Sequence, residues 1–282
     1  MRFFAEGNLP LDDRLFALLG NLIHERTGII FENGNQDLLA DKLSPLVVDR
    51  GFGSFLDYYY FLKYDDNAEA DWEQVIEALS VQETFFWREM DQVRALAEVI
   101  VPRFVASHPG EKLRIWSAAC ATGEEPLTIA MALAEAGWLA RAPIDIYASD
   151  VSPSALAKAR RGHYRERSFR SLPPALQNKY FTEKGGVWQV SPELHRRINY
   201  TRVNLMAEAE VGFLATATVI FCRNVFIYFS KTAIQQTVNR FFHRMPSPGY
   251  LCLGAAESLL KLDTDFRLEQ IGGAFIYLKP EG

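Results

Sequence analysis

The first hundred residues carry apolar side chains three and four positions apart, the spacing of helices that bury one face. Residues 11–27 show this repeat at Leu15, Leu18, Leu19, Leu22 and Ile23. Thr27-Gly28 follows, and a glycine after the last periodic residue is a frequent helix end. The same spacing predicts helices over 37–48, 55–62, 70–79 and 93–100. Residues 11–105 are therefore predicted to form a small helical bundle and a linking helix.

From Lys112 onward the hydrophobic pattern changes. Short apolar runs occur at 113–116, 144–150, 218–223, 249–253 and 275–278. Helical patterns separate them at 124–136, 153–160 and 231–245. Strands that alternate with helices predict a mostly parallel α/β sheet. The stretch 185–190, together with 198–200, predicts a small β-hairpin inserted between elements of that sheet.

Composition and charge argue against two classes of function. Hydrophobic residues make up 49% of the 282 residues and charged residues 23%, which is ordinary for a globular protein of two domains. A net charge of −5 argues against general nucleic-acid binding, because such binding needs a basic surface. No uncharged apolar run approaches the roughly twenty residues of a membrane span. One local basic cluster is interpreted as a solvated helix end and loop; it comprises Arg160, Arg161, Arg165, Arg167 and Arg170.

The three cysteines, Cys120, Cys222 and Cys252, are scattered through apolar segments. They have neither the spacing of metal ligands nor that of a disulfide framework. They indicate reduced thiols in a cytoplasmic protein. No metal site is predicted.

The chain is organised around the stretch Leu113–Leu133. An apolar run stops at small residues, turns at Gly123 and restarts with Pro126, where a helix beginning at Glu124 or Glu125 has its first turn. A phosphate prefers N–H groups and positive charge, so this pair of carboxylates favours a ligand with hydroxyls or an ammonium. Alternatively, first-turn glutamates only complement the helix dipole. We keep that explanation for Glu124 and predict Glu125 as the ammonium acceptor.

Asp150 closes the second predicted strand. Nucleoside-binding α/β folds place there the carboxylate that accepts hydrogen bonds from both ribose hydroxyls; a helix cap is the alternative. The Gly-x-Gly-x-x-Gly fingerprint of dinucleotide sites is absent, and only Gly123 is present. S-adenosylmethionine (SAM) fits better, because its ribose suits Asp150 and its ammonium suits a glutamate at the helix start.

Three segments together closely resemble the chemotaxis receptor glutamate methyltransferase (CheR) family. They are Ser117–Pro126 (SAACATGEEP), Ala148–Asp150 (ASD) and Ile220–Phe229 (IFCRNVFIYF). Residues 83–89 (ETFFWRE) also match that family's phenylalanine- and arginine-containing motif. Because the helical first region is similar to the family's N-terminal domain, the resemblance covers nearly the whole chain.

The resemblance implies a fold and a reaction. The fold is an all-α N-terminal domain over 1–80, a linker with the Thr-Phe-Phe-Trp-Arg motif over 81–105, and an α/β class I (Rossmann-like) SAM-methyltransferase domain over 106–282. A small antiparallel β-subdomain is inserted at about 185–200. The implied reaction moves a methyl group from SAM to glutamate side chains on the cytoplasmic domain of a methyl-accepting chemoreceptor, leaving S-adenosylhomocysteine (SAH). We expect a monomer.

The resemblance also implies the site residues. Arg88, Tyr228 and Arg223 are the expected catalytic residues. The expected cofactor contacts are Gln82, Thr84, Arg88, Gly123, Glu125, Asp150, Asn204, Leu205, Arg223 and Asn224. A glutamate of ordinary pKa is already ionised at pH 7, so the reaction needs alignment and no general base. Arg88 suits the substrate carboxylate because a guanidinium offers two parallel N–H donors.

The chain departs from the family pattern in three places. Gln82 stands where Asn is common, and Gly254-Ala255-Ala256-Glu257 replaces Gly-His-Ser-Glu. The second helix has only Lys42 and Arg50 as cations, whereas flagellar members have a strongly basic helix that matches an acidic receptor helix. Weaker electrostatic steering predicts an unusual receptor. The alternative functions are a non-catalytic SAM or SAH sensor and a methyltransferase that acts on a different protein.

Overall fold

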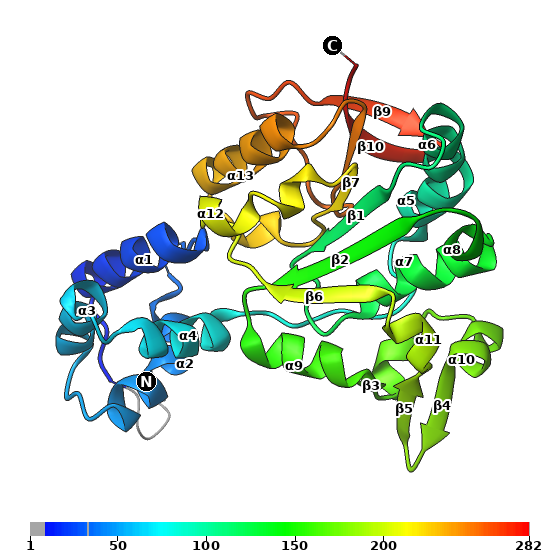
Figure 1. The fold of residues 1–282 in the computed structure, drawn as a ribbon. Coiled ribbons are helices and arrows are strands. Elements are labelled where there is room, and N and C mark those ends of the chain that lie inside the picture. The colour runs from blue at the N-terminus through cyan, green and yellow to red at the C-terminus, as the bar shows by residue number, and fades with distance from the viewer. Residues whose placement is uncertain (1–8, 33, 282) are drawn as a thin grey trace. The chain divides into compact units, whose positions relative to one another are not determined.

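The computed structural model describes residues 9–32 and 34–281. The chain divides into two compact units: residues 1–81 with 228–234, and residues 82–227 with 235–282. Residues 1–8, which the sequence assigns to the helical domain, lie outside the described part. Figure 1 shows the helices of the first unit in blue and the α/β second unit in cyan to red.

The described residues of the segment 9–81 form four helices. They are α1 (Asp13–Thr27), α2 (Gln36–Asp49), α3 (Phe55–Tyr64) and α4 (Glu69–Leu79). The Asp12 carboxylate accepts the Leu15 N–H at the start of α1, and Gly28 ends that helix with a φ of 77°. The Ser54 hydroxyl accepts the Asp57 N–H at the start of α3. Such caps satisfy N–H groups that have no partner within the helix, and the predicted all-α region is confirmed.

The core of the first unit comes from all four helices. Leu19, Leu39, Phe55 and Val75 are fully buried in one cluster. The segment 228–234 packs with this unit although it lies far along the chain. Its Ile29–Phe229 bridge is antiparallel, and it adds backbone hydrogen bonds from Ile30 to Tyr228 and from Ser230 to Gly28.

The second unit contains a seven-stranded sheet in the order β6-β2-β1-β7-β8-β10-β9. Its strands are β1 (Leu113–Ala118), β2 (Ile144–Asp150), β6 (Ile198–Arg202), β7 (Val219–Phe221), β8 (Gly249–Cys252), β9 (Arg267–Ile271) and β10 (Ala274–Lys279). The first five strands in this order are parallel, whereas β10 and β9 are antiparallel to their neighbours. The predicted mostly parallel α/β sheet is confirmed.

Helices cover both faces of this sheet (Figure 1). Before β1 the chain forms α5 (Met90–Ala95), a π-helical turn (Leu96–Ile100) and α6 (Val101–Ser107). After it come α7 (Glu124–Glu135), α8 (Trp138–Arg141), α9 (Pro153–Arg161), α12 (Glu208–Val211) and α13 (Lys231–Arg244). Short 3-10 turns span Glu166–Phe169, Leu214–Thr216 and Phe226–Tyr228. Ile129 of α7 and Leu156 of α9 join one apolar cluster with β1 and β2, whereas Phe241 of α13 packs on Trp116 with ring centroids 5.3 Å apart.

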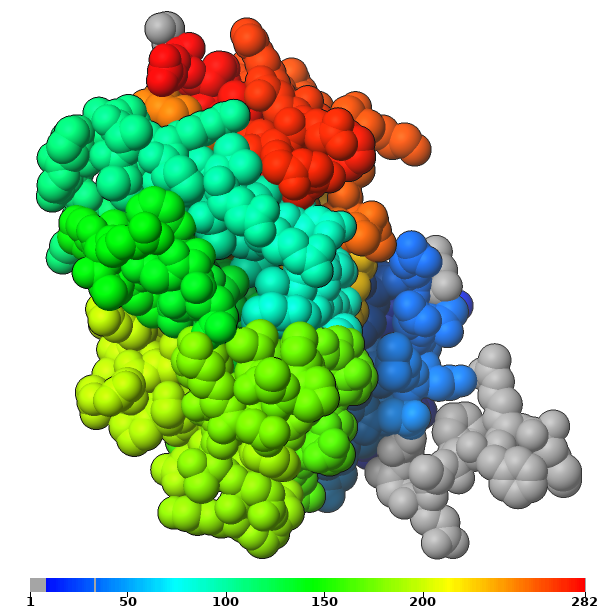
Figure 2. Space-filling view, turned by 90° about the vertical axis from the view of Figure 1, so that its right-hand side faces the viewer, coloured from blue at the N-terminus to red at the C-terminus, as the bar shows by residue number. Residues whose placement is uncertain are grey.

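A second, antiparallel sheet contains β3 (His163–Tyr164), β5 (Val187–Val190) and β4 (Phe181–Lys184), in that order. The helices α10 (Pro174–Tyr180) and α11 (Pro192–His195) flank it. In Figure 2 this region is a yellow-green lobe at the opposite end of the view from the red C-terminal strands.

The predicted inserted hairpin is partly wrong. Its turn at Gly185-Gly186 is present between β4 and β5, but residues 198–200 do not belong to it. They lie in β6, which pairs in parallel with β2 through Ile198–Ile146 and four further residue pairs. A short alternating run has no local signal that tells its pairing partner, because pairing is a long-range property.

Candidate active site at the carboxyl edge of the sheet

The sheet has its topological switch point between β1 and β7. The chain leaves β1 for α7 and then β2 on one side, whereas β7 is followed by β8 on the other. The loops after β1 and β7 therefore diverge, and open α/β sheets bind their ligands in the crevice formed there. Residues 119–123 and 222–225 are these two loops.

The loop after β1 has an unusual backbone. Ala119 and Ala121 have φ values of 56° and 47°, and Gly123 has 95°. Residues other than glycine rarely adopt this left-handed backbone conformation. Such backbone strain is concentrated at functional sites. The end of β2 holds the loop, because Cys120 donates its N–H to the Ser149 carbonyl over 2.8 Å.

Gly123 leaves no room for a side chain. A Cβ atom there would lie 3.0 Å from the Ala159 Cβ and 3.1 Å from the hydroxyl oxygens of Tyr164 and Tyr200. The Tyr164 hydroxyl donates to the Thr122 carbonyl. The Tyr200 hydroxyl is buried and has no hydrogen-bond partner in the described part of the chain. Gly123 is thus required by both its φ and its close packing.

Asp150 lies at the carboxyl end of β2 and is 9% exposed. Its carboxylate accepts the N–H of Ala121 over 2.8 Å and that of Ser152 over 2.9 Å. Ser152, not Asp150, is the N-cap of α9. The Gln82 amide donates to the Ser152 and Ser154 hydroxyls and accepts from Lys158. Asp150 therefore joins the β1 loop to the start of α9.

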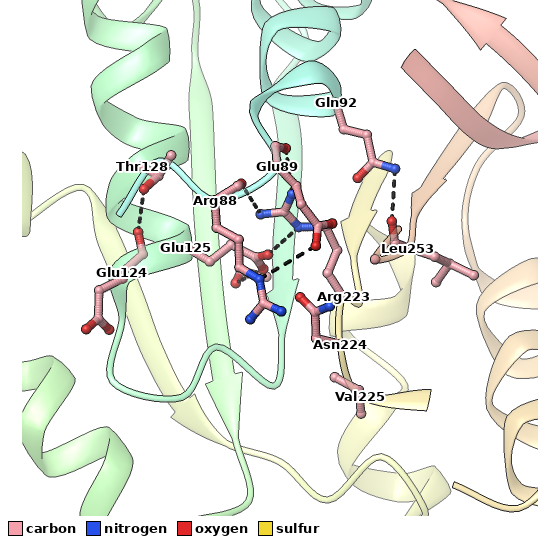
Figure 3. Close-up of polar contacts among 12 residues, drawn as sticks. Arg88, Glu89, Gln92, Glu124, Glu125, Thr128, Arg223, Asn224, Val225 and Leu253 are labelled. Carbon is pink, nitrogen blue, oxygen red and sulfur yellow. Dashed lines mark hydrogen bonds and ion pairs between the residues drawn. The ribbon is translucent and has the colours of Figure 1, made fainter. Parts of the chain in front are cut away.

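Glu125 and Arg223 form an ion pair (Figure 3), with 2.7 Å between Oε2 and Nε. Arg223 also donates to the carbonyls of Glu89 over 2.8 Å and Arg88 over 3.2 Å. Burial is the largest single effect and opposes the charge of Arg223, but the charge and hydrogen bond of Glu125 together with the Glu89 carboxylate outweigh it, so the pKa of Arg223 is raised. The other Glu125 oxygen accepts the Ser117 hydroxyl over 2.7 Å. The pair links the β7 loop, the first turn of α7 and the segment before α5.

Glu124 does more than complement the helix dipole. It is 2% exposed, and its carboxylate accepts hydrogen bonds from the hydroxyls of Thr122 over 2.6 Å and Ser168 over 3.0 Å. Burial raises the pKa of Glu124, although these hydrogen bonds oppose the shift. The side chain thus ties the β1 loop to the segment that follows β3.

The Glu83–Glu89 motif is anchored by aromatic packing. The Phe86 ring is buried against those of Tyr164, Phe169 and Phe181, with centroids 4.8 to 5.1 Å apart. After it, Trp87 and Glu89 adopt φ values of 68° and 49°. This irregular backbone directs the Arg88 and Glu89 carbonyls at Arg223.

The Arg88 side chain remains partly exposed, at 27%. Its Nε lies 3.6 Å from a Glu89 oxygen, and its guanidinium packs 5.5 Å from the Phe85 ring centroid. In Figure 3 this guanidinium points away from that of Arg223. The two arginines therefore differ: the Arg223 side chain is buried and bonded inside the protein, whereas the Arg88 side chain is partly exposed.

The remaining expected residues are placed as follows. Thr84 is half-buried in the motif, and Asn204 and Leu205 follow β6. Asn204 accepts the Met206 N–H on its side-chain oxygen. Asn224 follows Arg223 with a φ of 60°. Tyr228 falls in the first unit, where its carbonyl accepts the Ile30 N–H over 2.9 Å.

The sequence interpretation missed three polar residues of this network. Ser117 is a fully buried serine in β1 that binds Glu125. Glu89 accepts the Ala255 N–H over 3.1 Å, and Glu257 accepts hydrogen bonds from the β7 loop. A serine inside an apolar strand and a glutamate beside the expected catalytic arginine were the available signals.

The side chains at this edge fit SAM. Asp150 and Glu125 bring carboxylates beside the loop after β1, which suits a ligand with hydroxyl, ammonium and sulfonium groups. A carboxylate has about four acceptor positions, and Glu125 uses two of them for the Ser117 hydroxyl and the Arg223 guanidinium. No group of three potential metal ligands occurs among the residues that the structure describes. Within the same residues, no helix is long and apolar enough to cross a membrane.

Comparison with known proteins covers both units. The family model "CheR methyltransferase, SAM binding domain" matches residues 82–274, and "CheR methyltransferase, all-alpha domain" matches residues 14–80. Chemotaxis protein methyltransferase 2 of Vibrio cholerae is 34% identical over 275 residues, which cover 96% of this chain and 95% of that protein.

Two further relatives are chemotaxis protein methyltransferases of similar length. The Klebsiella aerogenes protein is 34% identical and the Escherichia coli protein 31% identical, each over 264 residues. These alignments cover 92% of this chain and 88% and 90% of the two relatives. This chain therefore belongs to the CheR methyltransferase family, and its second unit contains that family's SAM-binding domain.

Proposed function

We propose that this protein transfers the methyl group of SAM to glutamate side chains of a methyl-accepting chemoreceptor, forming glutamyl methyl esters for sensory adaptation. The observation that carries the proposal is the arrangement at the switch point. There the first turn of α7, the β7 loop and the Glu83–Glu89 motif of a CheR-family chain are joined through Arg223 and Glu125.

The main proposed cofactor contacts lie at or just after the carboxyl ends of the strands. Asp150 accepts hydrogen bonds from the ribose hydroxyls, and Glu125 accepts the ammonium. Asn204 and Leu205, after the neighbouring strand β6, meet the adenine. The other proposed contacts are Gln82, Thr84, Arg88, Gly123, Arg223 and Asn224.

Bound SAM supplies an electrophilic methyl group, and the protein aligns the substrate carboxylate with that group. The substrate carboxylate is ionised at pH 7, so no residue has to remove a proton. Arg88 holds this carboxylate with two parallel N–H donors. Arg223 fixes the backbone that carries Arg88, and Tyr228 is the third proposed catalytic residue. Alignment of this kind supplies about 7–11 kcal/mol of rate enhancement in favourable cases.

The partner is expected to differ from a strongly acidic receptor helix. Residues 9–81 contain 14 Asp and Glu against 5 Lys and Arg. On α2 and its C-cap residue Arg50, the anions Asp37, Asp41 and Asp49 outnumber the cations Lys42 and Arg50. Such a surface does not steer an acidic segment toward itself. The chemoreceptor substrate therefore presents a weakly charged or basic segment to this unit.

The proposed organisation keeps the boundaries taken from the sequence. The all-α domain covers 1–80, the linker 81–105 and the methyltransferase domain 106–282, and the protein acts as a cytoplasmic monomer. Size-exclusion chromatography with light scattering tests the oligomeric state.

A labelling experiment tests the function. Purified protein is incubated with SAM carrying a tritiated methyl group and with each chemoreceptor of the organism in turn. We expect base-labile label on one receptor and none with the Asp150→Ala variant. Absence of label on every receptor contradicts the proposal, and SAH binding without transfer supports the sensor alternative.

A further inference from the structure

Glu257, in the loop after β8, accepts four backbone hydrogen bonds. Its Oε2 accepts the N–H groups of Gly254 over 2.6 Å and Asn224 over 2.8 Å. Its Oε1 accepts those of Val225 over 2.8 Å and Phe226 over 2.7 Å. Three of the four donors are consecutive residues after β7, so a single carboxylate fixes the direction of that loop.

The β7 loop is thereby held from two sides. Arg223 extends its guanidinium to Glu125 and to the Arg88 and Glu89 carbonyls. The next residue, Asn224, has a φ of 60°, and its N–H points at Glu257. This left-handed backbone turns the chain between the two anchors, so the position of the arginine depends on both.

Gly254 allows the loop after β8 to approach the β7 loop closely. A Cβ atom on Gly254 would lie 2.6 Å from the Asn224 side-chain nitrogen and 2.9 Å from a Glu257 oxygen. Both distances are too short for real atoms, so a side chain here displaces Asn224 or Glu257. Ala255 and Ala256, the next two residues, are exposed.

The same loop also contacts the motif that carries Arg88. The Ala255 N–H donates to the Glu89 carboxylate, and the Gln92 amide donates to the Leu253 carbonyl over 3.0 Å. The loop after β8 is therefore attached to both segments that Arg223 connects, although none of the expected cofactor contacts lies in it.

We propose that Glu257 is a positioning residue for methyl transfer, acting through the β7 loop on Arg223 and the Arg88 backbone. The inference rests on the proposed function of this site. Asp150, Glu125 and Asn204, the proposed contacts to ribose, ammonium and adenine, lie on other segments. Although Arg223 and Asn224 are also proposed contacts, we expect loss of Glu257 to disturb the alignment for transfer more than the affinity for the cofactor. A misplacement of about 1 Å in an active site lowers the rate by about a hundredfold.

Glu257→Gln is the most specific variant, because glutamine has the same size as glutamate but one acceptor oxygen where glutamate has two. Its amide nitrogen is a donor, so it faces two backbone N–H groups that then lack an acceptor. Gly254→Ala disturbs the same contact without changing Glu257. Ala256→Ser is the matched control in the same loop, since its side chain is exposed.

Three measurements test the proposal on the full chain: steady-state methyl transfer, SAH affinity by calorimetry, and hydrogen exchange of a peptide covering residues 222–227. For Glu257→Gln and Gly254→Ala we expect kcat to fall about tenfold or more, an SAH Kd within about threefold of wild type, and faster exchange. Ala256→Ser keeps wild-type values in all three measurements.

A wild-type kcat or unchanged exchange in Glu257→Gln overturns the proposal. So does a loss confined to SAH affinity, because Glu257 then serves cofactor binding and not the alignment for transfer. If Glu257→Gln does not fold, Gly254→Ala decides by the same criteria. If the wild type neither binds SAH nor transfers methyl groups, the proposed function fails, and the exchange measurement still decides whether Glu257 holds the loop.

Discussion

The Arg223 guanidinium lies 2.7 Å from the Glu125 carboxylate, and the two side chains are only 3% and 13% exposed. They are 98 residues apart in the sequence, yet they join the β7 loop to the first turn of α7. A buried ion pair adds little net stability compared with apolar residues, but removal of one partner leaves an uncompensated charge. Loss of either charge is therefore expected to destabilise the second unit.

Glu125→Gln leaves the Arg223 charge without its anion. We expect the free energy of unfolding to fall by about 3–5 kcal/mol, measured by urea denaturation. The double variant Glu125→Gln with Arg223→Met is expected to lose less than the sum of the two single changes, because neither side chain is then charged. Simple additivity contradicts an energetic coupling of the pair.

Asp150→Asn is expected to weaken SAH binding before it affects turnover. The proposed ribose contact is a hydrogen bond to a charged group, worth about 1.5–3 kcal/mol, or roughly ten- to hundredfold in Kd. Calorimetry measures this change. Asp145→Asn is the control on the same strand, because Asp145 pairs with Lys112 over 3.1 Å. An unchanged SAH Kd in Asp150→Asn excludes the proposed contact.

Arg88→Ala is expected to lose most turnover, by about a hundredfold if alignment fails, with a smaller change in the KM for SAM. Arg88→Lys keeps the charge but not the two parallel N–H donors, so little activity returns. Steady-state kinetics with the receptor substrate measures both variants. Arg94→Ala is the control, since Arg94 pairs with exposed Asp91. A wild-type kcat in Arg88→Ala contradicts a role of Arg88 in the active site.

Local signals predicted the elements that carry the site. The start of α7 at Glu124 follows from Gly123 and Pro126, because a left-handed glycine and a first-turn proline act within a few residues. The end of β2 at Asp150 follows from an apolar run that stops there. Both features depend on sequence neighbours only.

Partners distant in the sequence could not be predicted in this way. Glu124 reaches the Ser168 hydroxyl, and Glu257 reaches the β7 loop more than thirty residues away. A position in the first turn of α7 explains the charge of Glu124 but not its burial. The main-sheet pairing of 198–202 was missed because alternation marks a strand and not its neighbour.

Gly123→Ala is expected to lower the stability of the second unit. Its φ of 95° costs an alanine about 1–2 kcal/mol, and crowding against Ala159 and the two tyrosine hydroxyls adds to this cost. Gly186→Ala separates the two effects, because its φ is 76° and nothing lies within 4 Å of an added Cβ. Denaturation of both variants measures the difference. Equal losses indicate that backbone strain alone matters at Gly123.

Glu124→Gln is expected to change how stability depends on pH. Burial raises the folded-state pKa of Glu124 above its ordinary value of 4.5, so the folded state binds the proton more tightly than the unfolded chain. The contribution of Glu124 to stability is then full below pH 4.5 and is lost as pH rises through the folded-state pKa. Glutamine does not titrate and keeps the same shape.

The difference in unfolding free energy between wild type and Glu124→Gln should therefore move against the wild type as pH rises from 4.5 toward 7. Denaturant unfolding across this range measures it. Glu135→Gln is the opposite control, because hydrogen bonds from Lys179 and Tyr180 lower the pKa of Glu135. For Glu135 the wild type should lose its advantage as pH falls below 4.5. The same slope in both variants contradicts the assignment of a raised pKa to buried Glu124.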